Sequence, residues 1–562
     1  MQNFLVTKFG KPLLSKDHMF ETPQRSTRRD FLDGGSIVLL LCVAIASGYV
    51  ILSPGTKSAP QAALLGSVIE VRPPAAESPS APVRTESLAP ATPSVATPEA
   101  PKPSESSKTI DTPKAAESPK ALEAPTPAKA AAIAPVRPPV PVSKPWRPVE
   151  PTSDTPWPAP TVTGRVVDAE HKPLAGASIV VRGVEIRTDA EGVFKAERVP
   201  PDAALLVKLP GFEKTYVAPT RGQVEVVLKP QAIKAAYLTY YGVGDRGIRS
   251  RVLDLTARTE LNAVVIDVKG DRGWILYQTE VPQALAIGAQ GPATLKDFDG
   301  LMADLKARGI YTIARIVTFK DNILANARPD LAITDTRTGK PWIDNEKLAW
   351  VDPFQEEVWA YNIALGQEAI RRGFDEVQFD YVRFPTDGKL SATRYAKTNS
   401  RETRLPAIAA FLAKARTELG ASGAFVAADL FGYTAFNEND TDIGQRIEEL
   451  APHLDFICPM VYPSGYHKGI PGHPNPVLVP GKVVSESVRL IRKRAGTNVV
   501  RVRPWLQDFK DYAFDRRIFG VTEVTAQIRG SEEAGGSGWM LWNPRNDYTA
   551  AALRSKPTLA SR

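Results

Sequence analysis

The strongest constraint on this chain is a repeat in its C-terminal half, where strand-like apolar runs alternate with segments of helical pattern. In the clearest helical segments, 295–308 and 354–371, apolar residues stand three and four positions apart. Eight such β/α repeats between residues 235 and 555 predict an α/β fold and fit a (β/α)8 TIM barrel. An open doubly wound sheet has the same repeat, so the pattern alone does not separate the two. The predicted strands are 236–241, 263–268, 311–318, 376–382, 424–430, 456–461, 502–506 and 538–542.

The segment before the repeats, 161–230, has a different pattern. Short runs of alternating apolar residues are separated by turns that contain Gly, Pro or Asp, as at 170–173 and 188–192. Short strands spaced 8–12 residues apart are typical of a sandwich. We therefore predict a small all-β sandwich domain for this segment.

Proline marks a third region. The chain has 50 prolines in 562 residues, and about half of them lie in 54–160, among Ala, Ser, Glu and Lys. Such a composition buries too little apolar surface to offset the entropy of ordering, which predicts a disordered Pro/Ala-rich linker. The linker is either a spacer that holds the later domains away from a membrane or a neutral tail.

The N-terminal region predicts export. Residues 36–52 carry no charge, and about 17 apolar residues is the lower limit for a membrane-spanning helix. Basic residues precede this run, so we expect a cytoplasmic tail at 1–35, a transmembrane anchor at 36–53, and the remaining domains outside the cytoplasm, in the periplasm or cell envelope. The alternative is secretion after cleavage of a signal, because Arg28 and Arg29 resemble a twin-arginine motif.

Composition also excludes several classes of site. The two cysteines are far apart, and Cys42 lies in the apolar run, so a disulfide framework is excluded. Five histidines without a cluster argue against a multi-histidine metal centre. The net charge of +8 comes without a dense Lys/Arg block, so no nucleic-acid partner is implied.

One motif points to a dinucleotide. Gly242, Gly244 and Gly247 form G-x-G-x-x-G after the first predicted strand, and Asp267 stands 20 residues beyond Gly247. The tyrosines before the motif are bulky where that fold packs tightly, and a soluble dinucleotide is a poor match to an exported domain. We expect a flexible βα loop here and keep a dinucleotide-binding oxidoreductase only as a third hypothesis.

Acidic residues recur at the C-terminal ends of the predicted strands, where barrels place their sites. Asp380 and Asp429 each end an apolar run, and Asp508 follows the seventh strand. A buried carboxylate is costly unless it is paired or functional. Although a single acid is more often a structural ion pair or a helix cap, the repeated placement leads us to predict a functional role for Asp380, with Asp429 and Asp508 as further candidates.

Aromatic and polar side chains gather at the same strand ends. Flat aromatic faces could stack on sugar rings, although ordinary barrel packing explains them too. Acids and aromatics together suit glycoside hydrolysis, in which one carboxyl protonates the leaving oxygen and a second acts as nucleophile or activates water. We expect no metal or organic cofactor. The predicted substrate-binding residues are Asp267, Lys269, Arg315, Tyr381, Arg383, Tyr462, Trp505, Gln507 and Trp542.

The sandwich segment resembles the carboxypeptidase regulatory-like domain. The shared motifs are GRVVD at 164–168, PLAGA at 173–177, TDAEGVF at 188–194 and PGF at 210–212. The resemblance implies a non-catalytic accessory module, with carbohydrate contact or structural spacing as its task.

The barrel segment, 237–548, contains seven motifs that carry a family resemblance: YLT (237–239), LNAVVIDVK (261–269), RIV (315–317), FDYVRFP (379–385), DLFG (429–432), PMVYPS (459–464) and RPWLQD (503–508). In these stretches it resembles a glycoside hydrolase family long catalogued as a domain of unknown function. The resemblance implies a TIM barrel distantly akin to those of the α-amylase and α-galactosidase type. By that analogy Asp380 is the nucleophile or base, Asp429 the acid/base, and Asp508 a stabiliser or alternative acid. The amylase-like pattern has Glu where this chain has Asp429.

Together these features predict an envelope-anchored O-glycosyl hydrolase that acts on a polysaccharide or oligosaccharide outside the cytoplasmic membrane. The competing hypothesis is a catalytically silent carbohydrate-binding protein of the envelope that keeps the barrel and its groove. The sugar, the linkage, endo or exo action and the stereochemistry stay open.

Overall fold

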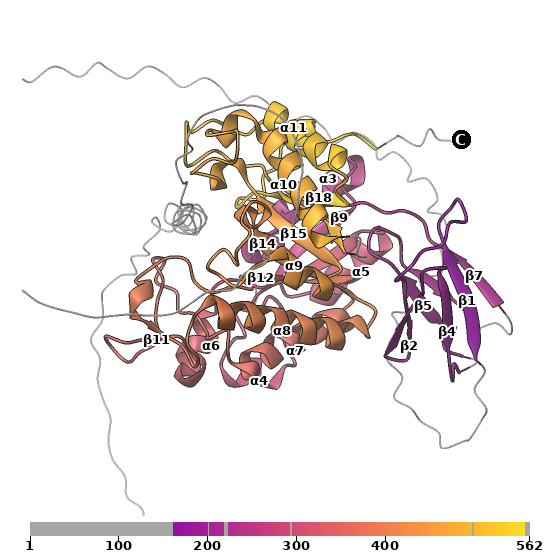
Figure 1. The fold of residues 1–562 in the computed structure, drawn as a ribbon, viewed down its shortest axis with the longest axis horizontal. Helices are drawn as coiled ribbons and strands as arrows, with labels where there is room; N and C mark the ends of the chain where they lie inside the picture. Colours follow the sequence, from indigo (N-terminus) through magenta and orange to yellow (C-terminus); the bar gives the residue numbers. More distant parts are fainter. Residues whose placement is uncertain (1–160, 201, 219–222, 293–294, 497–499, 557–562) are drawn as a thin grey trace, which may run out of the picture. The chain divides into compact units, whose positions relative to one another are not determined.

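The computed structural model describes residues 161–200, 202–218, 223–292, 295–496 and 500–556, which form a β-sandwich followed by a barrel (Figure 1). The predicted cytoplasmic tail (1–35), membrane segment (36–53) and linker (54–160) lie outside these residues. Within the described ranges, no helix combines the length and the apolar character needed to cross a membrane.

The N-terminal domain is a sandwich of two small sheets. One has the strand order β4-β1-β7 and the other β3-β2-β5-β6. Their inner faces enclose an apolar core that includes Val166, Ile179, Phe194, Val207 and Val226. The strands are β1 (Val162–Val167), β2 (Ser178–Val181), β3 (Val184–Arg187), β4 (Val193–Ala196), β5 (Leu205–Lys208), β6 (Thr215–Val217) and β7 (Gln223–Val227).

The C-terminal domain is a closed parallel barrel. Its strands follow the order β14-β12-β10-β9-β8-β18-β17-β15, and pairing of β14 with β15 closes the ring. This closure excludes the open doubly wound sheet and confirms the predicted TIM barrel. The strands are β8 (Ile233–Leu238), β9 (Ala263–Lys269), β10 (Tyr311–Val317), β12 (Glu376–Asp380), β14 (Phe425–Phe431), β15 (Phe456–Val461), β16 (Arg501–Val502), β17 (Trp505–Gln507) and β18 (Gly538–Trp542).

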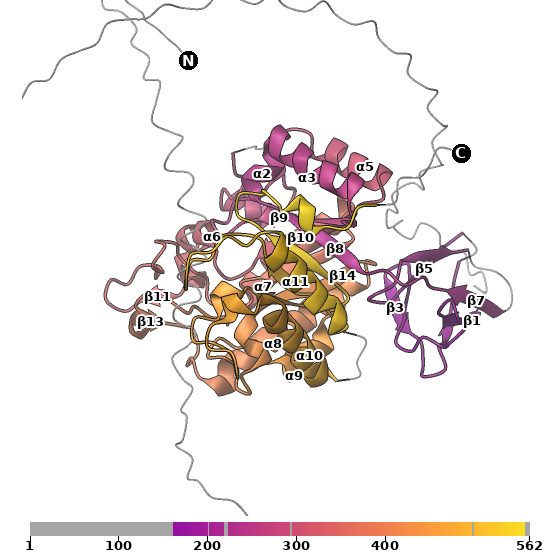
Figure 2. The same cartoon turned by 90° about the horizontal axis from the view of Figure 1, so that it is seen from above.

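Helices surround the strands in both views (Figure 2). Strand side chains alternate between the outer face, which packs on the helices, and the inner face, which fills the barrel. After β18 the described chain adds only the 3₁₀ turn η7 (Ala550–Ala552). The main helices are α3 (Arg246–Arg258), α5 (Phe298–Ala307), α7 (Glu356–Arg371), α8 (Arg401–Gly420), α9 (Ile447–Leu450), α10 (Pro480–Ala495) and α11 (Val521–Glu533).

Local sequence explains where these helices begin and end. Asp245 and Asp297 cap α3 and α5, each accepting a hydrogen bond from a backbone N–H of the first turn. Gly309 and Gly373, which follow α5 and α7, have φ of 64° and 99°. That left-handed conformation suits glycine and terminates a helix.

Two details differ from the predictions. The seventh strand is split into β16 and β17, because Pro504 has no N–H to donate to the ladder. The G-x-G-x-x-G stretch is not a flexible loop: it forms the short helix α2 (Tyr240–Gly244) and the start of α3. Thr239 caps α2, accepting a hydrogen bond from Gly242.

Long loops follow two adjacent strands at the C-terminal face of the barrel. The loop after β10 contains α6 (Asn322–Ala327) and β11 (Thr334–Asp335), and the loop after β12 contains β13 (Thr393–Arg394). β11 and β13 pair antiparallel, so the two loops form one lobe beside the strand ends (Figure 2).

The sandwich contacts the opposite end of the barrel. Lys208 and Lys214 donate hydrogen bonds to the carbonyls of Ala424 and Asp375, at 2.5 and 2.7 Å. Both carbonyls belong to residues immediately before a barrel strand, so these contacts lie at the N-terminal ends of the strands. Asp380 and Asp429 lie at the other ends, and the sandwich is therefore placed away from them.

Candidate active site

Four charged side chains from adjacent strands meet at the C-terminal end of the barrel interior. Asp267 lies on β9, Arg315 on β10 and Asp429 on β14, and Asp380 ends β12. All four residues are buried, with 1–5% of their surface exposed. The structure therefore brings together two of the three predicted catalytic acids and two predicted binding residues.

Arg315 is the centre of this cluster. Its Nη1 donates to Asp267 at 2.6 Å, and both Nε (3.0 Å) and Nη2 donate to Oδ2 of Asp380. The same Nε stands 3.9 Å from Oδ2 of Asp429. Burial opposes its charge, but the carboxylates of Asp267 and Asp380 raise the pKa of Arg315 well above its ordinary value. One permanent cation thus faces three carboxyl groups.

Asp429 has an environment that favours its neutral form. Its Oδ1 accepts a 2.7 Å hydrogen bond from Nε1 of Trp505, while Oδ2 has no hydrogen-bond partner among the described residues. Burial, followed by the charge of Asp380, raises the pKa of Asp429 well above its ordinary value, although Arg315 and Trp505 oppose the shift. Asp429 is therefore the group in the cluster best suited to hold a proton.

Asp380 has the opposite environment. Besides Arg315, the backbone N–H of Tyr381 donates to its Oδ1 at 2.6 Å, so both oxygens accept hydrogen bonds. Tyr381 has φ of 49°, a left-handed conformation that is uncommon for a tyrosine. The side chain of Asp380 keeps 7% of its surface exposed, against 1% for Asp429. Asp380 is thus the more strongly hydrogen-bonded of the two acids and the one nearer to solvent.

Three aromatic rings pack beside the carboxylates. Tyr237 and Trp542 stack with centroids 4.1 Å apart, and Trp505 meets both rings edge-on. The hydroxyl of Tyr237 donates to Asp267 at 2.5 Å. Trp542 is partly exposed at the strand ends, whereas Trp505 is buried. Trp542 therefore offers a surface to a ligand, and the buried ring of Trp505 packs against Trp542.

Tyr462, another predicted binding residue, lies next to the acids. Burial, with the charges of Asp429 and Asp380, raises the pKa of its hydroxyl well above the ordinary value. Tyr462 therefore stays protonated and can donate a hydrogen bond in the cluster.

Lys269 lies outside this cluster. Regular alternation along β9 would put Asp267 and Lys269, both predicted as substrate-binding, on one strand face, but the ladder between β9 and β10 shifts register between Arg315 and Ile316. This bulge turns Lys269 away from Asp267. Its Nζ instead forms a fully buried ion pair with Asp321 at 2.7 Å.

Three further predicted residues are held in other contacts. Asp508 accepts hydrogen bonds from the backbone and hydroxyl of Thr549, at 2.8 and 2.7 Å. Gln507 bonds Ser464, and Arg383 donates to the carbonyl of Phe384 at 3.0 Å. Within the described residues, no hydrogen bond or ion pair joins Asp508 to Asp380 or Asp429. The catalytic role of Asp508 stays a prediction, and its contacts anchor the segment that follows β18.

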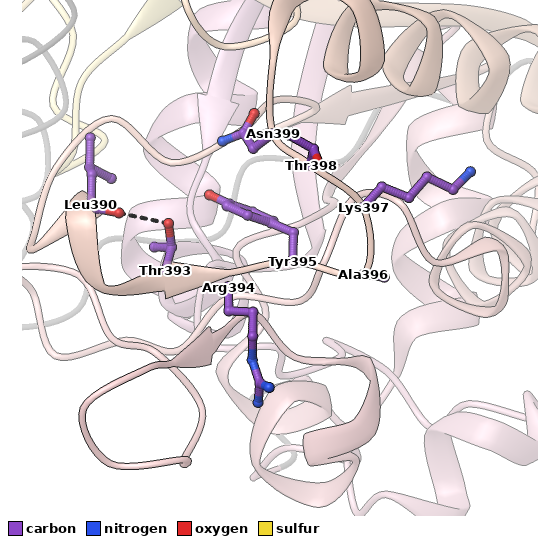
Figure 3. Close-up of a pocket in the computed structure, with 8 residues that line it drawn as sticks. All are labelled: Leu390, Thr393, Arg394, Tyr395, Ala396, Lys397, Thr398 and Asn399. Carbon is purple, nitrogen blue, oxygen red and sulfur yellow. Dashed lines mark hydrogen bonds between the residues drawn. The ribbon is translucent and has the colours of Figure 1, made fainter.

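A surface hollow lies in the loop after β12 (Figure 3). In Figure 3 the side chains of Arg394 and Lys397 point away from each other, and Thr393 donates to the carbonyl of Leu390 at 2.7 Å. No carboxyl side chain is among its lining residues, so the hollow lacks the acids that the strand ends supply. The residues that line the hollow are Leu390, Thr393, Arg394, Tyr395, Ala396, Lys397, Thr398 and Asn399.

The described part of the chain contains no group of three or more His, Cys, Asp or Glu side chains arranged to hold a metal ion. At the strand ends, the guanidinium of Arg315 lies between the carboxyl groups.

Sequence reasoning missed Tyr237 as a site residue. It stands on β8 at an inward position, two residues after Ala235, and both belong to the apolar cluster inside the barrel. The sequence could have indicated this role, because a tyrosine on the inner face of a strand needs a hydrogen-bond partner for its buried hydroxyl.

Comparison with known proteins adds family evidence. A family model described as "Putative glycosyl hydrolase domain" matches residues 235–548. A second model, the carboxypeptidase regulatory-like domain, matches residues 161–229. Among curated proteins, none matches the chain.

Three of the solved structures that are similar to this chain are as follows. A hypothetical protein from Ruminiclostridium thermocellum is 35% identical, covering 34% of this chain and 96% of that one, with a TM-score of 0.31. The PgaB (BpsB) glycoside hydrolase domain from Bordetella bronchiseptica is 14% identical (56% and 95% coverage, TM-score 0.41). A class V chitinase from Pseudomonas fluorescens is 11% identical (57% and 97% coverage, TM-score 0.36).

Proposed function

The chain belongs to the family described as "Putative glycosyl hydrolase domain", and on that basis we propose that its barrel hydrolyses O-glycosidic bonds with Asp380 and Asp429 as the catalytic pair. The substrate we propose is a polysaccharide or oligosaccharide outside the cytoplasmic membrane, as the N-terminal segment predicts.

One observation carries the proposal: two neighbouring carboxyl groups have opposite environments. Arg315 and the N–H of Tyr381 donate hydrogen bonds to both oxygens of Asp380, whereas burial and the charge of Asp380 raise the pKa of Asp429. Glycoside hydrolysis needs such a pair, one carboxylate and one carboxylic acid, on the two sides of the scissile bond. The acids are not chemically equivalent, and their roles follow from this difference.

The proposed reaction has two steps. Asp429 gives the proton of Oδ2 to the glycosidic oxygen as the bond from that oxygen to the anomeric carbon breaks, and a carboxylate oxygen of Asp380 bonds to that carbon. Water then attacks the anomeric carbon and gives one proton to Asp429, and the bond between that carbon and the carboxylate oxygen of Asp380 breaks. Forming the ester removes the charge of Asp380, and with it part of the repulsion that holds the proton on Asp429.

A substrate reaches the two acids by passing the aromatic side chains at the strand ends. Oδ2 of Asp429 is closed off from solvent in the unliganded protein, and the partly exposed rings of Tyr381 and Trp542 border the strand ends. We expect sugar binding to move these rings and open a path to Oδ2. Trp542 then provides the flat apolar face on which a sugar ring stacks.

Reducing-end release from a panel of glycans tests the proposal. The purified protein should release reducing ends from at least one glycan, and Asp380→Asn should abolish the release. Asp304→Asn, which removes an exposed carboxylate paired with Arg308 on α5, is the matched control and should retain activity.

Two outcomes would contradict the proposal. Turnover that survives Asp380→Asn would exclude the assigned role of this residue. Glycan binding without turnover would favour the silent carbohydrate-binding protein.

A further inference from the structure

We propose that Trp505 is a positioning residue for the acid: its indole N–H fixes Oδ1 of Asp429 and so places the transferable proton on Oδ2. This inference rests on the proposed function, since it concerns how the acid of that reaction is oriented. The observations behind it are the 2.7 Å hydrogen bond from Nε1 to Oδ1 and the absence of a partner for Oδ2 among the described residues.

The chemistry of the indole decides which oxygen carries the proton. An indole N–H can only donate, so the oxygen that it contacts must act as an acceptor. A neutral carboxyl group bound in this way carries its proton on the other oxygen. In Asp429 that oxygen is Oδ2, which lies 3.9 Å from the Nε of Arg315. The same Nε lies 3.0 Å from Asp380. The oxygen that carries the proton therefore lies near the same guanidinium nitrogen as Oδ2 of Asp380.

The packing of Trp505 prevents its ring from turning. Its indole meets Tyr237 at a centroid distance of 6.0 Å and Trp542 at 5.4 Å, with interplanar angles of 89° and 85°. Those two rings stack on one another, and Tyr237 is itself tied to Asp267. With 1% of its surface exposed, Trp505 offers no face to a sugar. The sequence predicted it as a binding residue, and its contacts assign it to the acid instead.

The same hydrogen bond also serves the step after proton transfer. Once Oδ2 has given up its proton, Asp429 is a buried carboxylate. The N–H of Trp505 at Oδ1 and the guanidinium of Arg315 beside Oδ2 then stabilise its charge. Trp505 thus lowers the cost of ionising the acid without touching the substrate.

Trp505→Phe tests this role, because it removes the N–H and keeps an aromatic ring. We expect kcat on an unactivated glycan to fall about tenfold, with KM changed by less than about twofold. The loss of a donor that favours ionised Asp429 should also move the alkaline limb of the kcat profile to higher pH. On a substrate with a good leaving group, which needs no protonation, kcat should stay within about twofold of the parent.

Trp539→Phe is the matched control. Trp539 is equally buried, and its Nε1 has no hydrogen-bond partner among the described residues. Its replacement removes an indole N–H without touching Asp429, so kcat and the pH profile should stay as in the parent. If Trp505→Phe leaves the alkaline limb where it was, or lowers kcat equally on activated and unactivated substrates, the proposal is overturned.

A measurement on the unmodified sequence keeps the test independent of variant folding. The protein has nine tryptophans, whose indole N–H resonances can be followed after ¹⁵N labelling. One resonance should change position at the pH of the alkaline limb, and Asp429→Asn should remove that change. If no indole resonance shifts with the titration of Asp429, Trp505 does not form a hydrogen bond with Asp429. If the protein hydrolyses no glycan, the proposed function is wrong. The pH dependence of the indole resonance would still test the hydrogen bond between Trp505 and Asp429.

Discussion

Asp380 and Asp429 share one arginine unequally: Nε of Arg315 lies 3.0 Å from Oδ2 of Asp380 and 3.9 Å from Oδ2 of Asp429. Asp380 also receives a second guanidinium hydrogen bond, whereas Asp429 receives none. This difference, with the deeper burial of Asp429, separates a carboxylate from a carboxylic acid within one cluster.

Replacing the shared arginine should disable the site. Lysine keeps the charge but lacks the planar fork that contacts Asp267 and Asp380 together. We expect Arg315→Lys to lower kcat by about 10²-fold or more, and urea unfolding to show a loss of about 3 kcal/mol as the buried carboxylates lose their partner. Activity within tenfold of the parent would show that charge alone is sufficient.

The division of roles predicts a dependence on the leaving group. Asp429→Asn removes the proton donor, so kcat on a natural glycan should fall by about 10²–10⁴-fold. On an aryl glycoside with a good leaving group, bond cleavage needs no proton and the first step should be nearly unaffected. Asp380→Asn should be inactive on both substrates. Burst-phase and steady-state rates of phenol release measure the two cases, and equal losses for Asp429→Asn would contradict its role as the acid.

The spacing of the acids predicts the stereochemistry. Because both Oδ2 atoms contact the same nitrogen at 3.0 and 3.9 Å, they lie within about 7 Å of each other, and the inverting class spans about 6.5–9.5 Å. This favours the retaining class, so the first product should keep its anomeric configuration. NMR of the fresh product before mutarotation distinguishes the outcomes, and an inverted anomer would make Asp380 a base.

Backbone conformation at Tyr381 predicts a difference between two small substitutions. Its φ of 49° is tolerated by Asn and resisted by β-branched residues. Tyr381→Asn and Tyr381→Val both remove the ring, but the Val variant should lose about 1–2 kcal/mol more of unfolding free energy. Because the N–H of Tyr381 holds Asp380, the Val variant should also lose more activity. Equal stability in urea would show that the conformation is not strained.

Asp508 should affect stability rather than catalysis. Burial raises its pKa to about 6, although hydrogen bonds from Thr549 oppose the shift. Because the pKa of Asp508 is higher in the folded than in the unfolded protein, the buried side chain favours folding most when it is protonated, below about pH 4. As the pH rises to about 6, the free energy of unfolding should fall by about 3 kcal/mol. Asp508→Asn should remove this part of the pH dependence and keep glycan turnover. Urea unfolding at pH 4 and pH 7 checks the first effect, and loss of turnover in the folded variant would restore Asp508 as an acid.

The barrel was predictable because each strand is a local apolar run, and the predicted and observed strands agree within a few residues. The clustering of Asp380 and Asp429 was predictable too, since parallel strands of a barrel end on one face.

What could not be predicted depends on contacts between distant residues or on register. The bulge that separates Lys269 from Asp267 appears only when β9 pairs with β10. The partner of Asp508 is Thr549, 41 residues away, and that of Tyr237 is Asp267. The membrane anchor and the linker remain predictions.

The ion pair of Glu376 and Arg503, fully buried inside the barrel, bears on how the domain closes. Nη1 of Arg503 contacts Glu376 at 3.1 Å, yet Glu376 lies on β12 and Arg503 directly follows β16, and these two strands are separated by β14 and β15. In a flat sheet, three strand spacings would hold the two backbones about 14 Å apart. Curling the sheet into a ring brings the charges together, so an uncurled intermediate would have to keep both hydrated. The pair therefore exists only in the closed ring, and a variant that breaks it should destabilise the ring as a whole rather than one end of it.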